Sequence, residues 1–242
     1  MPSKAKKIAL VTGANKGIGF EVARQLAASE CIVLLGARNE ALGKEAKAKL
    51  GAEGLDVRFV LIDVTERSTI KAAAENISRD FGRLDILINN AGINDPADGP
   101  ALTAQLDAVE HVLRTNFLGA LAVTQAMLPL LRNSAAGRIV NVSSGLGSLT
   151  RSASSNLSST NLIGYSASKA ALNMLTVQLA RLLGDTAIKV NSAAPGYTAT
   201  DLNGFRGTQT IPEGAVEAVR LALLPDDGPT GSYSERAGII PW

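Results

Sequence analysis

The chain has 242 residues, of which 46% are hydrophobic, 19% are charged and only 4% are aromatic, and its formal net charge is +2. This is the composition of an ordinary soluble globular protein, and the length allows one sizeable hydrophobic core. The small charge and scarce aromatic side chains argue against a nucleic-acid partner, and no stretch approaches about 18 uninterrupted apolar residues, which argues against a membrane span.

Short apolar runs rich in β-branched residues alternate along the chain with longer segments that carry a helical pattern. The expected strands cover residues 7–12, 32–37, 57–62, 84–89, 138–143, 188–193 and 231–235, and helical segments between them include 19–29, 66–81 and 214–224. Repetition of strand, helix and strand predicts right-handed βαβ units. The sequence therefore predicts a single α/β domain over residues 1–242, a doubly wound Rossmann fold with a mostly parallel seven-stranded sheet flanked by helices.

The first expected strand leads into "TGANKGIGFEVARQLA", with glycines at positions 13, 17 and 19. Glycine lets the backbone turn tightly and approach a pyrophosphate, while the start of the following helix supplies oriented N–H groups. The spacing G-x3-G-x-G differs from the G-x-G-x-x-G of the standard dinucleotide-binding turn. Its place after the first strand of a βαβ series still predicts a phosphate-binding turn.

The end of the second strand indicates which dinucleotide binds. An NAD enzyme presents an acidic side chain there to the ribose 2′-hydroxyl, but this chain has Ala37 followed by Arg38. Arg38 can pair with a 2′-phosphate, and Lys16 in the glycine turn adds a second positive charge. The pair predicts NADPH as the cofactor.

Other residue types restrict the chemistry and the location. Cys31 is the only cysteine and His111 the only histidine, which excludes an internal disulfide and leaves no expected metal site. The first residues lack the apolar run of a signal peptide, so we expect a cytoplasmic protein. Residues 143–164 are rich in Ser, Gly and Asn without a clean period, and they follow a strand end where ligands bind, so we expect them to shape a substrate pocket.

Six motifs together resemble those of the short-chain dehydrogenases/reductases. They are "TGANKGIG", "NNAG" at 89–92, Asn116 in "RTNFLG", "NVSS" at 141–144, "YSASK" at 165–169 and "PGYTAT" at 195–200. Their order and spacing match that family from about residue 7 onward. The residues from 195 onward look like the NADPH-dependent carbonyl reductase branch.

The resemblance implies a catalytic set of Asn116, Ser144, Tyr165 and Lys169. Tyr165 and Lys169 are four residues apart, so a helix places both on one face, where the ammonium is expected to lower the pKa of the phenol and make it a general acid. Adjacent strand residues face opposite ways, and the family pattern selects Ser144 over Ser143. By resemblance, Lys169 also contacts the nicotinamide ribose and Asn116 anchors a water.

The resemblance also implies the cofactor contacts. Asp63 and Val64 are expected at the adenine, residues 90–92 along the cofactor, and Thr198 and Thr200 near the carboxamide and phosphates. The complete expected set is Gly13, Asn15, Lys16, Gly17, Ile18, Gly19, Arg38, Asp63, Val64, Asn90, Ala91, Gly92, Tyr165, Lys169, Pro195, Gly196, Thr198 and Thr200.

These observations predict an NADPH-dependent carbonyl reductase whose partner is a small-molecule carbonyl or alcohol. A 3-oxoacyl or hydroxysteroid-type reductase and a non-catalytic NADPH-binding protein stay open, since fold does not determine function. Both a monomer and a homo-oligomer also stay open. Residues 201–211, which follow the last motif and contain small polar residues and glycines, are expected to form a lid over the nicotinamide and substrate.

Overall fold

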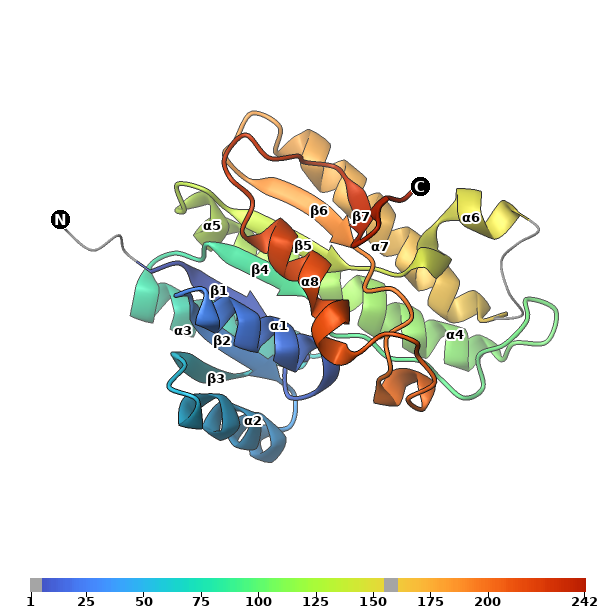
Figure 1. Cartoon of the computed structure of the whole chain (residues 1–242), viewed down its shortest axis with the longest axis horizontal. Coiled ribbons are helices and arrows are strands. Elements are labelled where there is room, and N and C mark those ends of the chain that lie inside the picture. The colour runs from blue at the N-terminus through green and yellow to red at the C-terminus, as the bar shows by residue number, and fades with distance from the viewer. Residues whose placement is uncertain (1–5, 155–160) are drawn as a thin grey trace.

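A computed structural model describes residues 6–154 and 161–242 of the chain. Helices cover both faces of one sheet whose strand order is β3-β2-β1-β4-β5-β6-β7-β8 (Figure 1). Its strands are β1 (Ile8–Val11), β2 (Ile32–Ala37), β3 (Val57–Leu61), β4 (Ile86–Asn89), β5 (Arg138–Val142), β6 (Lys189–Ala193), β7 (Tyr233–Glu235) and β8 (Gly238–Ile239). This confirms the predicted Rossmann-type fold.

The strand count differs from the prediction by one. Each of the seven predicted strands contains one of β1 to β7, and these pair in parallel throughout. The short strand β8 pairs antiparallel with β7 and makes the sheet eight-stranded. Two residues are too few to show a period, so the sequence pattern did not reveal it.

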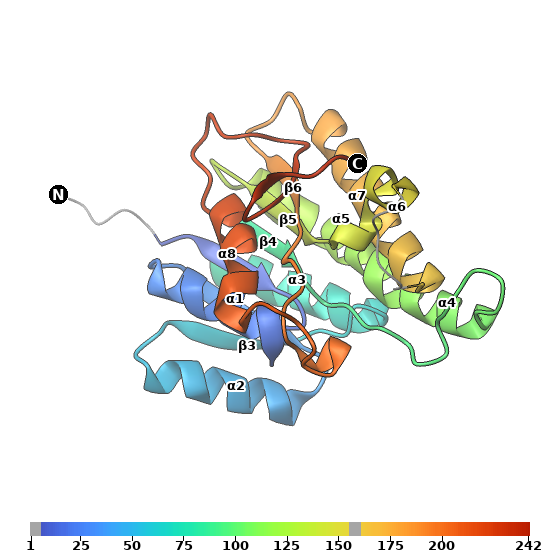
Figure 2. The same cartoon turned by 45° about the vertical axis from the view of Figure 1, so that its right-hand side comes forward.

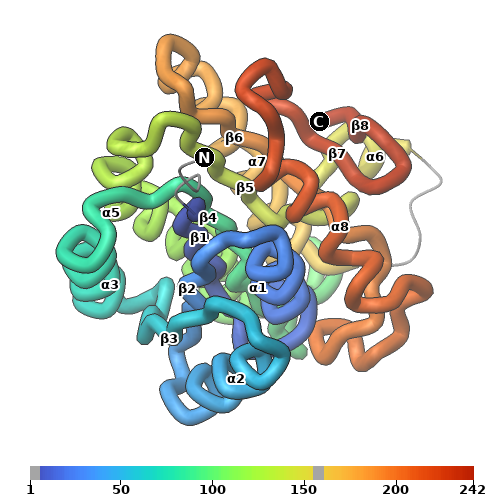
Figure 3. The backbone as a smooth tube through the Cα atoms, turned by 60° about the vertical axis from the view of Figure 1, so that its left-hand side comes forward, coloured from blue at the N-terminus to red at the C-terminus, as the bar shows by residue number. Residues whose placement is uncertain are grey.

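The helices are α1 (Gly17–Ala28), α2 (Glu40–Ala52), α3 (Arg67–Phe81), α4 (Leu106–Leu113), α5 (Ala120–Arg132), α6 (Leu149–Ala153), α7 (Ile163–Leu182) and α8 (Ile211–Ala222). One hydrophobic core joins the sheet to α1, α2 and α8, and a second joins its other face to α3, α5 and α7. Figure 3 shows α3 and α5 on one side of the strands and α1 and α8 on the other. Among the described residues, none of the helices combines the length and the apolar character that a membrane span requires.

Strand β1 shows why the sequences of the strands are continuous apolar runs. Ala9 and Val11 belong to one core, whereas Ile8 and Leu10 belong to the other. Successive side chains of a strand point to opposite faces, so a strand covered on both faces is apolar at every position.

The order of the strands reverses beside β1. The chain runs outward from β1 through β2 to β3 and then crosses back to β4 on the other side of β1. Such a reversal opens a crevice at the carboxyl ends of the strands, which is where ligands bind in this kind of sheet. Figure 2 shows α4, α6 and the start of α7 gathered beyond this end of the sheet.

Two segments contain local structure that the sequence pattern did not predict. The irregular segment predicted at 143–164 contains a short 3-10 helix, η2 (Gly145–Gly147), and α6, because the hydroxyls of Ser144 and Ser148 accept hydrogen bonds from the first N–H groups of these turns. Residues 155–160 of that segment lie outside the described residues, as do residues 1–5. After α4 the chain continues directly as a π-helical turn, η1 (Arg114–Gly119).

Candidate active site

The glycine turn after β1 is locked against the segment that follows β4. Gly13 and Gly17 have φ angles of +63° and +59°, which L side chains rarely adopt. A Cβ atom on Gly19 would lie 2.3 Å from Nδ2 of Asn90 and 2.6 Å from the carbonyl oxygen of Gly13. Asn90 Nδ2 donates hydrogen bonds to the carbonyls of Thr12 (2.9 Å) and Gly13 (3.2 Å). The turn therefore has no space for a side chain at Gly19, and the positive φ angles favour glycine at positions 13 and 17.

A cavity of about 670 Å³ lies at this end of the sheet. Every residue of the predicted cofactor set lines it, and so does Ser144 of the predicted catalytic set. The volume is within the range typical of sites for small molecules and cofactors. The cavity lies at the crevice that the reversal of strand order opens, and it brings together residues that are far apart in the sequence.

Part of the cavity wall lies outside the predicted catalytic and cofactor-binding sets. Ser143, Leu146 and Leu162 belong to the segment 143–164 that was expected to shape the pocket, and Asp201, Leu202 and Asn203 belong to the expected lid. The lining residues that were not predicted in either way are Ile62, Ile93, Asn94, Pro96, Thr115, Val142 and Tyr197. They lie within or next to recognised motifs or predicted site residues, as Ile93, Asn94 and Pro96 lie shortly after "NNAG". Their closeness to these motifs in the sequence is the feature from which they could have been predicted.

Tyr165 and Lys169 lie in the first turns of α7 and point into the cavity region. Lys169 Nζ lies 5.5 Å from the centre of the Tyr165 ring and donates a hydrogen bond to the carbonyl of Val142 at 2.8 Å. Lys169 is only 4% exposed, whereas Tyr165 is half-buried as a whole residue. The lysine is thus anchored to the end of β5, beside Ser144.

The pKa values correct one expectation. Removal of the phenol from water raises the pKa of Tyr165 to about 12, and a hydrogen bond with the Ser144 side chain opposes this rise. Burial lowers the pKa of Lys169 to about 8. The expected net decrease in the pKa of Tyr165 is therefore wrong for this structure, because desolvation outweighs any stabilisation of the phenolate by Lys169, whose ammonium donates to a carbonyl.

Replacing Lys169 with Met is expected to remove a rise in stability between pH 8 and pH 10.5. The unfolded lysine has a pKa near 10.5 and the folded one near 8, so between these values the unfolded chain binds more protons. The free energy of unfolding then increases with pH, by about 3 kcal/mol over the whole interval. Urea unfolding of both proteins across this pH range measures the difference, and an identical pH dependence would contradict it.

Asn116 lies behind the cavity wall and does not line it. In the π-helical turn η1, its Oδ1 accepts from Ile93 N at 2.8 Å, and its Nδ2 donates to Ile93 O and to Ser168 Oγ, both at 3.0 Å. A Cβ on Gly92 would lie 3.4 Å from Asn116 Oδ1 and 3.6 Å from Lys169 Nζ. Asn116 thus ties the segment after β4 to α7, and its predicted role of anchoring a water stays a prediction.

Asp98 is a structural support of Tyr165 that the sequence did not reveal. Its buried carboxylate accepts hydrogen bonds from Gly164 N (2.9 Å) and Tyr165 N (2.8 Å), and Gly99 O accepts from Ile163 N (3.0 Å). The first N–H groups of a helix have no partner within the helix. A distant segment supplies these partners and fixes the turn that carries Tyr165.

The two cations predicted to meet a 2′-phosphate differ in their surroundings. Lys16 forms an exposed ion pair with Asp201, which follows the "PGYTAT" motif. Arg38 is exposed and, within the described residues, forms no ion pair. An exposed pair contributes only about 0–1 kcal/mol, so Lys16 can exchange Asp201 for another anion. Arg38, which has no ion-pair partner among the described residues, is available to bind an anion such as a 2′-phosphate.

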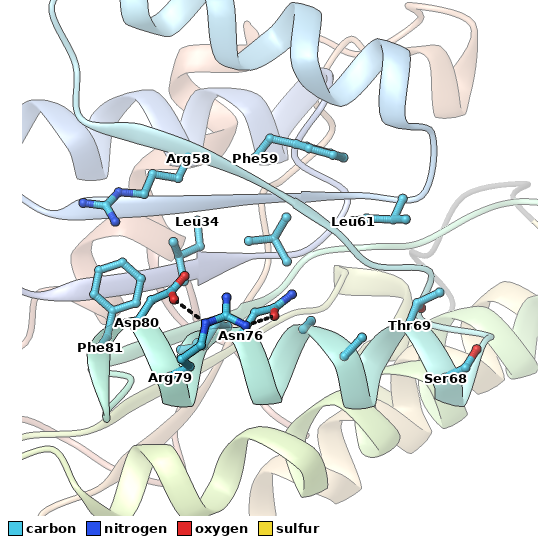
Figure 4. Close-up of a pocket in the computed structure, with 14 residues that line it drawn as sticks. Leu34, Arg58, Phe59, Leu61, Ser68, Thr69, Asn76, Arg79, Asp80 and Phe81 are labelled. Carbon is cyan, nitrogen blue, oxygen red and sulfur yellow. Dashed lines mark hydrogen bonds and ion pairs between the residues drawn. The ribbon is translucent and has the colours of Figure 1, made fainter.

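A second hollow, of about 530 Å³, lies between the edge strand β3 and α3 (Figure 4). Arg58 lies over the Phe81 ring at 4.9 Å, and Arg79 is occupied by hydrogen bonds to Asn76 and Asp80. None of the predicted catalytic or cofactor-binding residues lines it. The cavity at the carboxyl ends of the strands is therefore the candidate active site.

Comparison with known proteins agrees with this geometry. The family profile described as short chain dehydrogenase matches residues 7–210. Carbonyl reductase [NADPH] 1 of Mus musculus is 33% identical, with 99% of this chain and 100% of the relative covered. (-)-Isopiperitenone reductase of Mentha piperita is also 33% identical, covering 97% of this chain and 98% of the relative. The resemblance to carbonyl reductases is confirmed.

Solved structures give the same result. The NADPH-bound carbonyl reductase from chicken fatty liver superposes with a TM-score of 0.86 at 28% identity, covering 99% of this chain and 100% of that chain. Salutaridine reductase from Papaver somniferum superposes with a TM-score of 0.83 at 32% identity, covering 94% and 99%. The chain is therefore an oxidoreductase that belongs to the short-chain dehydrogenase/reductase family.

Proposed function

We propose that the protein is an NADPH-dependent carbonyl reductase in which Tyr165 donates a proton to the substrate oxygen. The observation that carries this proposal is the convergence of Ser144, Tyr165 and Lys169 on one cavity with the glycine turn. The cavity residues fit a dinucleotide, because side chains are excluded at Gly13 and Gly19 where a pyrophosphate would approach. A bound nicotinamide would supply the hydride.

The residues of the chain would handle the proton and the substrate oxygen. With a pKa of about 12, Tyr165 is fully protonated at neutral pH and is ready to donate. The Ser144 hydroxyl, which already interacts with this phenol, would give the substrate oxygen a second hydrogen bond. The Lys169 ammonium, 5.5 Å from the Tyr165 ring, would stabilise the phenolate that forms after transfer.

The substrate side of the cavity favours an uncharged carbonyl compound with an apolar body. Ile93, Pro96, Leu146, Leu162 and Leu202 contribute apolar side chains to the wall. Arg151, which follows Leu146 in the chain but does not line the cavity, is paired with Glu235 at 2.7 Å. Burying a charged substrate group against such a wall would be costly.

Steady-state oxidation of NADPH against a panel of carbonyl compounds tests the function. The panel should contain neutral apolar ketones and aldehydes, their carboxylate-bearing analogues, 3-oxoacyl thioesters and steroid ketones. Preferential turnover of the neutral apolar compounds supports the proposal. Turnover restricted to 3-oxoacyl thioesters or steroids would favour those reductases, and NADPH binding without any turnover would favour a non-catalytic protein.

Replacing Arg38 with Asp is expected to weaken NADPH binding and relatively favour NADH. Losing a charge-assisted contact to the 2′-phosphate costs roughly 1.5–3 kcal/mol, which corresponds to about 10- to 150-fold in affinity. Fluorescence titration of both nucleotides measures the change. Arg67, exposed at the start of α3 and outside the cavity, offers the same charge change as a control. Equal affinity of the unmodified protein for NADH and NADPH would contradict the assignment.

The segment at residues 201–211 is expected to close over bound ligands. It begins with a 3-10 turn, η3 (Asp201–Asn203), whose three residues line the cavity, and Phe205 beyond it is 63% exposed. Main-chain bonds near Gln209 tether its far end to Ala199. Hydrogen exchange with and without NADPH and a substrate analogue measures closure. Unchanged protection of this segment on ligand binding would show that it is a passive connection.

A further inference from the structure

Ser144, the predicted catalytic serine, lies where the chain leaves the sheet after β5. Ser143 N makes the last ladder hydrogen bond, to Ala193 O at 2.7 Å, and Ser144 already lies beyond β5. The Ser144 carbonyl is held from two sides: it accepts from Gly147 N at 2.8 Å and from the hydroxyl of Tyr233. The second of these partners comes from β7, which lies two strands away from β5.

The side chain of Tyr233 is buried in the protein. It is 1% exposed, and its ring stacks on Trp242 with centroids 5.3 Å apart and an interplanar angle of 24°. Burial raises the pKa of its hydroxyl, so the group is a protonated donor at neutral pH. Its main-chain oxygen accepts from Ile240 N at 2.8 Å, which ties the ring's position to the chain that leads to Trp242.

The segment that ends in Trp242 is in turn fastened to α6. The main-chain oxygen of Trp242 accepts from both N (2.9 Å) and Oγ1 (2.7 Å) of Thr150, and that of Pro241 accepts from Ser148 Oγ at 2.5 Å. Arg151 adds an ion pair with Glu235. Residues 233–242 thus bind the chain from Ser144 to Arg151 along its length.

We infer that Tyr233 is a positioning residue for Ser144: its hydroxyl holds the Ser144 carbonyl, and the Trp242 ring holds Tyr233. The inference rests on the proposed function, because Ser144 must act on the substrate for its position to affect turnover. Displacement of a hydrogen-bonding group by a fraction of an ångström lowers the rate of a reaction that depends on alignment. Tyr233 does not line the cavity and contacts no reacting atom.

The test is Tyr233→Phe, which removes one hydroxyl and keeps the ring on Trp242. We expect kcat to fall about three- to tenfold, the value of one lost hydrogen bond, with NADPH affinity unchanged. Trp242→Ala should produce a similar loss, whereas Trp242→Phe, which keeps a stacking ring, should restore most of the activity. Ser234→Ala is the matched control, because it removes a buried hydroxyl from the same strand that is bonded to Glu217 and not to Ser144.

A second measurement does not depend on turnover. Hydrogen exchange of residues 144–153 should be faster in Tyr233→Phe than in the unmodified protein and unaffected in Ser234→Ala. Unchanged exchange together with unchanged kcat would overturn the inference. An unmodified protein that reduces no carbonyl compound would instead overturn the proposed function, and the exchange of residues 144–153 would still decide whether Tyr233 holds them.

Discussion

Tyr165→Phe is expected to lower carbonyl reduction about 10²- to 10⁴-fold, the usual contribution of a positioned general acid. The phenol is the protonated group that faces the cavity beside Ser144, with its pKa raised to about 12 by burial. The ring stays in place without the hydroxyl, since α7 is held through main-chain bonds to Asp98. NADPH affinity should therefore change by less than about threefold, or well under 1 kcal/mol.

Tyr197→Phe is the comparison variant. It also removes a phenol hydroxyl from the cavity wall, but this hydroxyl makes no hydrogen bond within the described residues, and the residue is exposed. Its turnover should stay close to that of the unmodified protein. Similar activities for the Tyr165 variant and the unmodified protein would remove Tyr165 from the role of acid.

Gly19→Ala is expected to produce the second large effect, on cofactor binding and stability together. The new methyl group would lie 2.6 Å from the carbonyl oxygen of Gly13 and 2.3 Å from Nδ2 of Asn90, so backbone as well as side chain must move. Overpacking of this kind costs about 1–3 kcal/mol. Because the displaced atoms shape the phosphate turn, NADPH affinity should fall at least about tenfold, as 1.4 kcal/mol is one factor of ten.

The control for this prediction is Gly51→Ala, which places the same methyl group in another helix. No atom lies within 4 Å of a Cβ built at Gly51, and the residue is part of α2. Alanine should stabilise the protein there by about 0.5–1 kcal/mol, because glycine loses more conformational freedom on folding. Thermal unfolding and NADPH titration measure both variants. A Gly19 variant that binds NADPH as tightly as the Gly51 variant would contradict the role assigned to the turn.

The fold was predictable because the features that specify it are local in the sequence. Apolar runs that are buried on both faces, as in β1, differ from the helical period of segments such as α3, and alternation of the two predicts a parallel sheet. The glycine turn and the four-residue spacing of Tyr165 and Lys169 are likewise short-range patterns. Strand β8 and the π-helical turn η1 were not predicted, since neither two residues nor a single turn is long enough to show a period of its own.

The sequence by itself determined the Rossmann-type fold, the motifs of the family and the set of polar residues at the strand ends. Only the tertiary structure decided what surrounds them. Hydrogen bonds join Asp98 to Tyr165, 67 residues away in the sequence, and Tyr233 to Ser144, 89 residues away. Lys16 likewise binds Asp201, 185 residues away. It also decided the pKa values, since burial raises that of Tyr165 and lowers that of Lys169. The physical reason is that desolvation and long-range hydrogen bonds depend on which distant segments pack together, and no local period or spacing carries that information.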